Sequence, residues 1–539
     1  MATSGIHVVA CAAIGVAAAA CSLSGLTGGG DGGGGAAAAE TTGIGPSTTG
    51  SVSTSTATTS GAGGDGGGGT GPGGGDGGGG APPTSDLFAW AEGVGSAYDE
   101  STLGTDRRVS VAVAGDVVVV ARVLDEDPDP ATGARRDRLE IVGLDPVSGE
   151  RQFLLGFAHA GGDDDDVLQL GEVTPFLSRV VVPLGVKGTL ELPGGEAITT
   201  NDDDGVVIVV DTEDPGVLAG LVTIGGAGPL IAQSVAVATD GDLLVGGRFS
   251  GDLPGCPGGG AALGDNRGFV ARIDAATGNC TRAVHFGGMG GAFRRTGVRG
   301  LAIDGDLAMA VGGYAGTLPL ATQTFTSKGE SDAFLVRLDL AGGGLALRSG
   351  SARRFGGTEP DLLRDVVSLG GGYFALAGQA NAGDVDAYCG GSPLPAGWHA
   401  LVLRVGPAGN CNWLRALPTD GTGGLWSARS LAVGSDGGLV VGGAFRSLLP
   451  CPGVEPWLGV DADGFVLALD PANGRTTHGV RVGTAAEHAV TSVATLGQAS
   501  EPVIAGSYDQ VFDPLLPAPA SRDLFTGRLQ PMPALPCAP

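Results

Sequence analysis

The chain has 539 residues, of which 104 are Gly and 32 are Pro, and only 5% of the residues are aromatic. Apolar residues still make up 42% of the sequence, so a core can form if the glycines are concentrated in a tail and in short turns. A net charge of −27 repels nucleic-acid phosphates and anionic membrane surfaces, and we expect neither as a partner.

Residues 1–21 have the character of a secretion signal. The apolar run of residues 6–21 is shorter than the ~20 residues that a membrane span needs. Its end, Ala19-Ala20-Cys21, resembles the end of a bacterial lipobox, in which the cysteine is lipidated. The resemblance implies an extracytoplasmic protein, anchored to the outer membrane through Cys21; the alternative is a secreted protein with an ordinary cleaved signal.

Residues 22–85 are mostly Gly, Ser, Thr and Ala with scattered acids. Such a segment cannot bury enough apolar surface to offset its loss of conformational entropy, so we expect a disordered linker. As a random coil it would reach about 45 Å, and it would hold the following domain away from a membrane.

Two markers repeat with one period through residues 86–539. The first is an apolar run that ends in glycine, and the aligned glycines, spaced by 66, 65, 65 and 63 residues, are Gly247, Gly313, Gly378, Gly443 and Gly506. The second is a Phe-containing run, such as Gly268-Phe269-Val270-Ala271-Arg272, which keeps step with the first. Weaker copies around residues 122 and 185 extend the series to seven units.

Each unit contains four short apolar runs that are separated by Asp-Gly, Gly-Asp or Gly-Gly, which indicates four strands and no helix. Four-stranded units repeated radially predict an all-β fold, a single seven-bladed β-propeller. The last unit stops after its third run, and the isolated run of residues 88–92 resembles a fourth run, with Trp90 matching Trp413. We therefore expect the N-terminal strand to complete the last blade and close the ring.

Phe-Gly-Gly follows the fourth run at Phe286-Gly287-Gly288 and Phe355-Gly356-Gly357. With the two markers, this pattern resembles the bacterial seven-bladed β-propeller repeat of secreted proteins and lipoproteins, over roughly residues 86–530. The resemblance implies the fold and an extracytoplasmic setting. It implies no activity and supplies no catalytic residues.

Six cysteines lie outside the signal segment, and four occupy matched positions in two units. Their placement relative to the repeat glycines predicts two local disulfides, Cys256–Cys280 and Cys389–Cys411. By elimination Cys451 would pair with Cys537. Disulfides are typical of an oxidising compartment.

Acidic clusters are concentrated in the first two units, and we expect them in loops on one face. Besides residues 125–129, the clusters consist of Asp163, Asp164, Asp165, Asp166, Asp202, Asp203 and Asp204. Because calcium takes 6–8 oxygen ligands, these residues are candidate calcium ligands. The alternative is that they form solvated acidic loops that serve solubility. We expect no other cofactor.

The sequence has no zinc-protease or nucleophile-elbow motif, so we assign no catalytic residue. The leading hypothesis is a monomeric, non-enzymatic binding or scaffold module on a tether. It would bind a protein or glycan through a face of long loops at residues 249–267, 315–331, 380–398 and 445–463. The alternative is an extracellular polysaccharide-active hydrolase or lyase, with paired carboxylates at the propeller channel.

Overall fold

In the computed structural model the chain has two units, residues 13–82 and residues 1–12 with 83–539. The structure describes residues 85–98, 108–126, 136–160, 168–215, 218–225, 228–251, 253, 255–258, 267–287, 296–320, 323–381, 389, 397–418, 427–448, 457–483, 487–519 and 522–535. The signal segment, Cys21 and the predicted linker lie outside them. None of the described residues belongs to a helix long and apolar enough to cross a membrane.

The described residues form antiparallel β-sheets and a single 3-10 turn, η1 (Ala341–Gly343), so the all-β prediction is confirmed. Three sheets have four strands each, with consecutive strands as neighbours. Their strands are β11 (Leu230–Val237), β12 (Leu243–Phe249), β13 (Arg267–Ile273) and β14 (Cys280–Phe286); β22 (Leu362–Gly370), β23 (Tyr373–Asn381), β24 (Trp398–Val405) and β25 (Cys411–Pro418); and β26 (Ser427–Val433), β27 (Leu439–Leu448), β28 (Trp457–Leu469) and β29 (Thr476–Val482).

The sheet between the first two of these has a divided fourth strand. Its strands are β15 (Gly297–Asp304), β16 (Leu307–Tyr314) and β19 (Asp332–Asp339), and β19 pairs with both β20 (Ala346–Leu347) and β21 (Arg353–Phe355). The long loop expected at residues 315–331 contains a hairpin, β17 (Thr317–Leu320) and β18 (Gln323–Thr326).

The first two repeat units are joined into one nine-stranded sheet. β5 and β8 connect the two units through two residue pairs, His159 with Leu190 and Ala160 with Thr189. This pairing is possible because β8 continues past a register shift between Val186 and Gly188. The strands of this sheet are β2 (Val109–Ala114), β3 (Val117–Glu126), β4 (Arg136–Leu144), β5 (Arg151–Ala160), β6 (Leu168–Leu170), β7 (Thr174–Phe176), β8 (Arg179–Glu191), β9 (Ala197–Asp211) and β10 (Leu218–Ile224).

The N-terminal strand completes the last sheet. β1 (Phe88–Tyr98) pairs with β32 (Arg522–Leu529), which follows β30 (His488–Thr495) and β31 (Pro502–Tyr508). Trp90 Nε1 donates to Pro146 O at 3.1 Å, and Trp413 Nε1 donates to Pro471 O at 2.9 Å. The two tryptophans thus make equivalent contacts with the following repeat unit, as their sequence similarity predicts.

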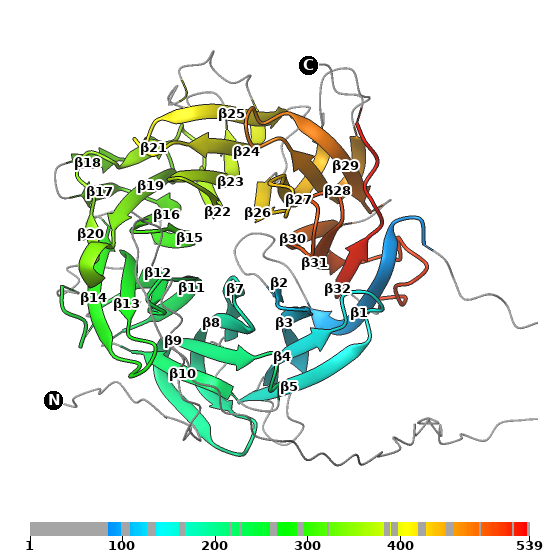
Figure 1. The fold of residues 1–539 in the computed structure, drawn as a ribbon, viewed down its shortest axis with the longest axis horizontal. Coiled ribbons are helices and arrows are strands. Elements are labelled where there is room, and N and C mark those ends of the chain that lie inside the picture. Colours follow the sequence, from blue (N-terminus) through cyan, green and yellow to red (C-terminus); the bar gives the residue numbers. More distant parts are fainter. Residues whose placement is uncertain are drawn as a thin grey trace, which may run out of the picture. The chain divides into compact units, whose positions relative to one another are not determined.

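Within residues 83–539 the sheets surround a common centre, and the first strand of each repeat unit lies nearest to it (Figure 1). Five of these first strands contain a register shift typical of a β-bulge. The extra residues are Gln233, Arg299, Arg364, Arg429 and Thr491.

The bulges explain the repeated glycines. A Cβ at each would overlap with a backbone carbonyl oxygen of the bulged first strand, and at four of the five the Phe of the third strand also packs against the glycine. These glycines are Gly247, Gly312, Gly378, Gly443 and Gly506. Gly312, rather than the Gly313 of the sequence alignment, is therefore the structural equivalent in its unit. The two sequence markers keep one period because they contact each other.

Side-chain acceptors link neighbouring first strands around the centre. Each acceptor lies just after the bulge position or its equivalent, and it accepts a backbone N–H of the next repeat unit. The hydroxyl acceptors and their donors are Ser110 Oγ with Val173 N (3.0 Å), Ser430 Oγ with Val493 N (3.2 Å) and Ser492 Oγ with Val111 N (3.0 Å). The last of these links the last sheet to the first. We call these acceptor positions the inner ring.

Asp365 occupies the inner ring where the preceding strand has Gly300. A Cβ at Gly300 would lie 2.8 Å from Asp365 Cα, so a side-chain acceptor has no room there. Asp365 Oδ1 instead accepts its neighbour Val366 N at 2.6 Å, and Oδ2 accepts Leu431 N of the next strand at 2.6 Å. A carboxylate thus satisfies two buried donors where serine satisfies one.

We predict that Trp90→Ala lowers the free energy of unfolding by about 3 kcal/mol, since it empties a buried site and removes an intersheet hydrogen bond. Denaturant unfolding measures the loss, and Val147→Ala, at a side chain that is 74% exposed, is the control. Equal stability of Trp90→Ala and the parent would contradict the assigned role of β1.

Candidate functional site

A cavity of about 490 Å³ lies among the first strands. Residues from every repeat unit line it, in segments 111–113, 172–176, 234–237, 301–303, 365–368, 431–433 and 493–495. Six of the segments, all except 172–176, begin at the residue after a bulge or its equivalent, or at the next residue along the strand. The cavity therefore lies on the side toward which the first strands run.

The cavity lining is chiefly aliphatic, with a few hydroxyl and carboxyl groups. The hydroxyl groups of Ser234, Ser368 and Thr495 belong to it, and Thr495 Oγ1 donates to Val433 O at 2.8 Å. The carboxyl groups are those of Glu172 and Asp365. Asp365 is only 2% exposed, and each of its oxygens accepts a backbone N–H, so its carboxylate is committed to the inner ring.

The predicted calcium ligands are only partly within the described residues. Asp163, Asp164, Asp165 and Asp166 lie outside them, so their role stays a prediction. Asp202, Asp203 and Asp204 lie inside β9, and their expected place in a loop is wrong. The hairpin instead turns at residues 192–196, where Gly194 and Gly195 have positive φ and Leu192 N bonds Glu196 O. In the described part of the chain no group of three or more His, Cys, Asp and Glu residues could hold a metal ion.

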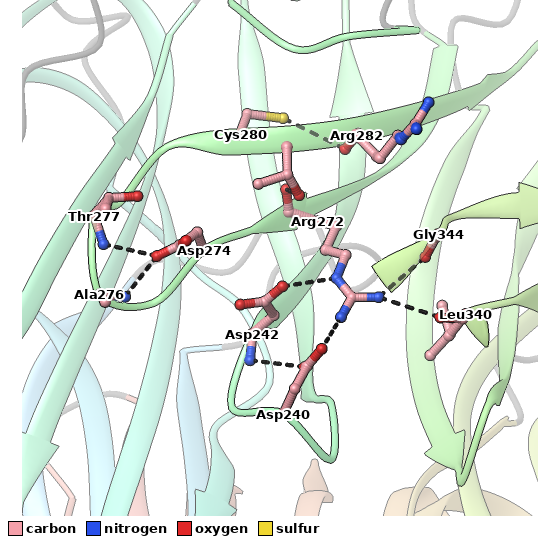
Figure 2. Close-up of polar contacts among 11 residues, drawn as sticks. Asp240, Asp242, Arg272, Asp274, Ala276, Thr277, Cys280, Arg282, Leu340 and Gly344 are labelled. Carbon is pink, nitrogen blue, oxygen red and sulfur yellow. Dashed lines mark hydrogen bonds and ion pairs between the residues drawn. The ribbon is translucent and has the colours of Figure 1, made fainter. Parts of the chain in front are cut away.

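A compact cluster of charged side chains surrounds Arg272 on β13 (Figure 2). Its guanidinium, with the side chain 2% exposed, contacts Asp240 and donates through Nε to Asp242 Oδ2 at 2.8 Å. On its other side Nη1 donates to Gly344 O at 3.0 Å, in the next repeat unit. The guanidinium thus lies between these two aspartates and the next sheet.

The same kind of contact recurs at the junctions of other sheets. Arg404 Nη1 donates to Pro471 O at 3.2 Å, and Arg528 Nη1 donates to Pro146 O at 3.3 Å. In each case an arginine of a third strand bonds a carbonyl in the following unit. The Arg272 cluster is therefore a connection between sheets, repeated with the fold.

Both predicted local disulfides are present. Cys256 is bonded to Cys280, and Cys389 is bonded to Cys411. Cys280 and Cys411 begin β14 and β25, so the bridges attach at equivalent strands. Cys451 and Cys537 lie outside the described residues.

Two buried carboxyl groups belong to Asp332, the first residue of β19, and to Asp361, the residue before β22. Asp361, which is 0% exposed, accepts Gly357 N at 2.7 Å and Asn381 N at 2.8 Å. Burial raises the pKa of Asp361 to about 7, and the nearby Asp332 carboxylate acts in the same direction. Burial also raises the pKa of Asp332, against the hydrogen bond from Lys328 N and the charge of Arg354.

The sequence reasoning did not identify the inner ring. Two of its hydroxyl acceptors, Ser430 and Ser492, were nonetheless visible as serines that precede the repeat glycine by 13 and 14 residues. Serine is common in loops and strand ends, so this signal gains meaning only when the first strands are placed side by side.

No protein-family model matches the chain, and no curated protein matches its sequence. Among solved structures, Pyrococcus horikoshii acylaminoacyl peptidase is 10% identical with a TM-score of 0.39; the match covers 80% of this chain and 54% of the peptidase, about half its length. The polysaccharide lyase Uly1 is 10% identical with a TM-score of 0.40, covering 83% and 99%. An exo-beta-1,3-galactanase from Clostridium thermocellum is 10% identical with a TM-score of 0.29, covering 72% and 86%.

We predict that Arg272→Met destabilises the protein by about 3 kcal/mol, because it leaves Asp240 and Asp242 beside each other without their cation. Asp242→Asn added to that variant should restore part of the loss. Arg282→Met, at an exposed neighbour, is the control in denaturant unfolding. A loss no larger than that of the control would show that the cluster does not hold the sheets together.

Asp361 makes the stability of the folded protein depend on pH. Its pKa in the folded protein, about 7, lies above the ordinary 3.8, so the protonated group favours folding. That contribution is complete below about pH 4 and is lost as the pH rises through about 7. Asp361→Asn should therefore lose less thermal stability than the parent between pH 5 and about 8. An unchanged slope, equal to that of the exposed control Asp116→Asn, would contradict the assignment.

Proposed function

We propose that residues 86–539 form one closed seven-bladed β-propeller and that it serves as an extracytoplasmic, non-enzymatic binding module. The closed ring is supported by the pairing of β1 with β32 and by the bond between Ser492 and Val111, which joins the last sheet to the first. One cavity lined by every repeat unit is the observation that carries the binding function.

The proposed ligand of this cavity is a short glycan. The cavity volume of about 490 Å³ lies within the range of small-molecule sites, about 300–1,000 Å³. First strands such as β11, β22 and β26 are at sheet edges, so one side of each backbone carries N–H and C=O groups that no sheet partner takes. With Ser368 and Thr495, these groups supply donors and acceptors for sugar hydroxyl groups.

The proposed setting is the cell envelope. Disulfides of the kind found at Cys256 and Cys280 are typical of an oxidising compartment. We propose that a lipid on Cys21 holds the protein at the outer membrane and that residues 22–85 carry the propeller, as a monomer, away from that surface. The resemblance to the bacterial repeat of secreted proteins and lipoproteins supports this setting.

In its hydrolase form, the enzymatic alternative requires two carboxyl groups that act on the glycosidic bond. Glu172 and Asp365 both line the cavity, but the Asp365 carboxylate is held by two backbone N–H groups. The arrangement therefore supports binding over hydrolysis. Release of reducing sugar from a bound glycan by the parent protein would favour the alternative.

We predict that Ser368→Trp abolishes glycan binding, because the indole fills space in the cavity. A glycan array selects the ligand and calorimetry of the purified protein measures its affinity. Val147→Trp, at an exposed position, should bind like the parent. Unchanged affinity in a folded Ser368→Trp variant would exclude the cavity as the binding site.

A further inference from the structure

The turn between β7 and β8 has a leucine in the left-handed backbone region. Phe176, the last residue of β7, pairs with Arg179 at the start of β8, and the two residues between them form the turn. Leu177 has a φ of 56°, and among the described residues it is the only one other than glycine with a positive φ. A positive φ at the first residue of a two-residue turn is typical of glycine, because a Cβ disfavours it.

Other repeat units have glycine at the same place. The two-residue connection from β2 to β3 begins with Gly115 (φ 57°), and that from β15 to β16 begins with Gly305 (φ 60°). The residues between β22 and β23 are both glycines, Gly371 and Gly372. The turn thus requires the backbone conformation but no side chain, and the fold does not explain Leu177.

The Leu177 side chain contributes nothing to the core. It is 80% exposed, the most of any large apolar side chain in the described part of the chain. Burial therefore does not offset the strain of its backbone. Strained residues that the fold does not need are concentrated at binding sites, where the strained residue contacts the ligand.

The residue before Leu177 lines the cavity. In β2 and β15 the cavity lining ends at Val113 and Ile303, two residues before the glycine of the turn, whereas in β7 it extends to Phe176. Phe176 is half-buried, and it is the one aromatic side chain among the described lining residues. An aromatic and a leucine therefore lie together at the edge of the cavity. We call Phe176 and Leu177 the apolar lip.

The strand that carries the lip is fixed on both sides. Val173 N donates to Ser110 Oγ of the preceding repeat unit at 3.0 Å, and Thr174 Oγ1 donates to Val235 O of the following unit at 2.7 Å. In Figure 1, β7 lies among the first strands that surround the centre. The lip is therefore preorganised, and a ligand need not order it on binding.

A ligand that fits this site has an apolar face and a polar edge. The lip supplies apolar surface, whereas Ser368, Thr495 and the edge backbone of the first strands supply hydrogen-bonding groups. A pyranose ring with equatorial hydroxyl groups has this division, because its C–H bonds point to the two faces and its hydroxyl groups lie around the edge. An axial hydroxyl group would face the apolar lip and lose its hydration.

We propose that the apolar lip stacks against the C–H face of a glucose-configured sugar ring, in which every ring hydroxyl group is equatorial. The Phe176 ring supplies a large apolar contact area at low conformational cost, and Leu177 adds to that area. The inference rests on the cavity being the glycan site of the proposed function, and it names the class of glycan.

Calorimetry of the purified protein with cellotriose, a chain of β-1,4-linked glucose, tests the proposal. The comparison probe is β-1,4-mannotriose, which differs by an axial hydroxyl group at C2 of each ring. We expect cellotriose to bind about tenfold or more tightly than mannotriose. Equal binding of the two would overturn the role of the lip. Absence of cellotriose binding, with another glycan bound by the parent and lost in Ser368→Trp, would overturn this inference and leave the proposed function standing. Absence of any glycan binding would overturn both.

Phe176→Ala should weaken cellotriose binding about tenfold or more, because it removes the stacking surface. Phe176→Tyr keeps the ring and should bind like the parent. Thermal unfolding checks that both variants are folded. Equal affinity of folded Phe176→Ala and the parent would overturn the proposal.

Leu177→Gly separates a binding role from a structural one. It relieves the left-handed strain, so the variant should unfold at a higher temperature than the parent and yet bind cellotriose more weakly, by about threefold or more. The control Val147→Gly removes another exposed apolar side chain, at a position without positive φ, and should bind like the parent without a gain in stability. Parent-like cellotriose affinity in Leu177→Gly, or equal weakening by Val147→Gly, would overturn the assignment of Leu177 to the site.

Discussion

Every repeat unit presents the edge of its first strand to the centre, and an edge strand leaves backbone N–H groups that its own sheet does not satisfy. At four junctions among the described residues the inner ring meets this requirement with a side-chain acceptor, as Ser430 does for Val493 and Ser492 does for Val111. Because the donor belongs to the next sheet, satisfying it also fixes the distance between sheets. The width of the cavity follows from this spacing.

The bulges connect this ring to the repeat that is visible in the sequence. The extra residue in a first strand moves a carbonyl oxygen over the second strand, where glycine alone has room, as at Gly247 and Gly443. Phe269 and Phe465 of the third strands then pack against those glycines. Glycine, phenylalanine and bulge are thus parts of one packing unit.

Sequence reasoning succeeded where a residue has one structural task that recurs. The Trp90–Trp413 similarity placed β1 beside β32, and the matched cysteines identified two disulfides. It failed for Asp203 and Asp204, since acidity suggested a loop, whereas β9 pairs with β8 on both sides of this point, through Thr200 with Gly188 and Asp204 with Val186. The cavity could not be predicted, because its lining depends on which side of the inner ring a residue lies, and a one-residue bulge determines that side.

The central claim is that side-chain acceptors join the last sheet to the first as firmly as they join the sheets between. Native-state hydrogen exchange tests it at Val111, whose N–H is accepted by Ser492, 381 residues away in the chain. The account predicts that the Val111 amide exchanges as slowly as those of Leu431 and Val493, and that Ser492→Ala accelerates Val111 selectively. Fast exchange at Val111 in the parent, with Leu431 and Val493 protected, would show that the ring is open at this junction.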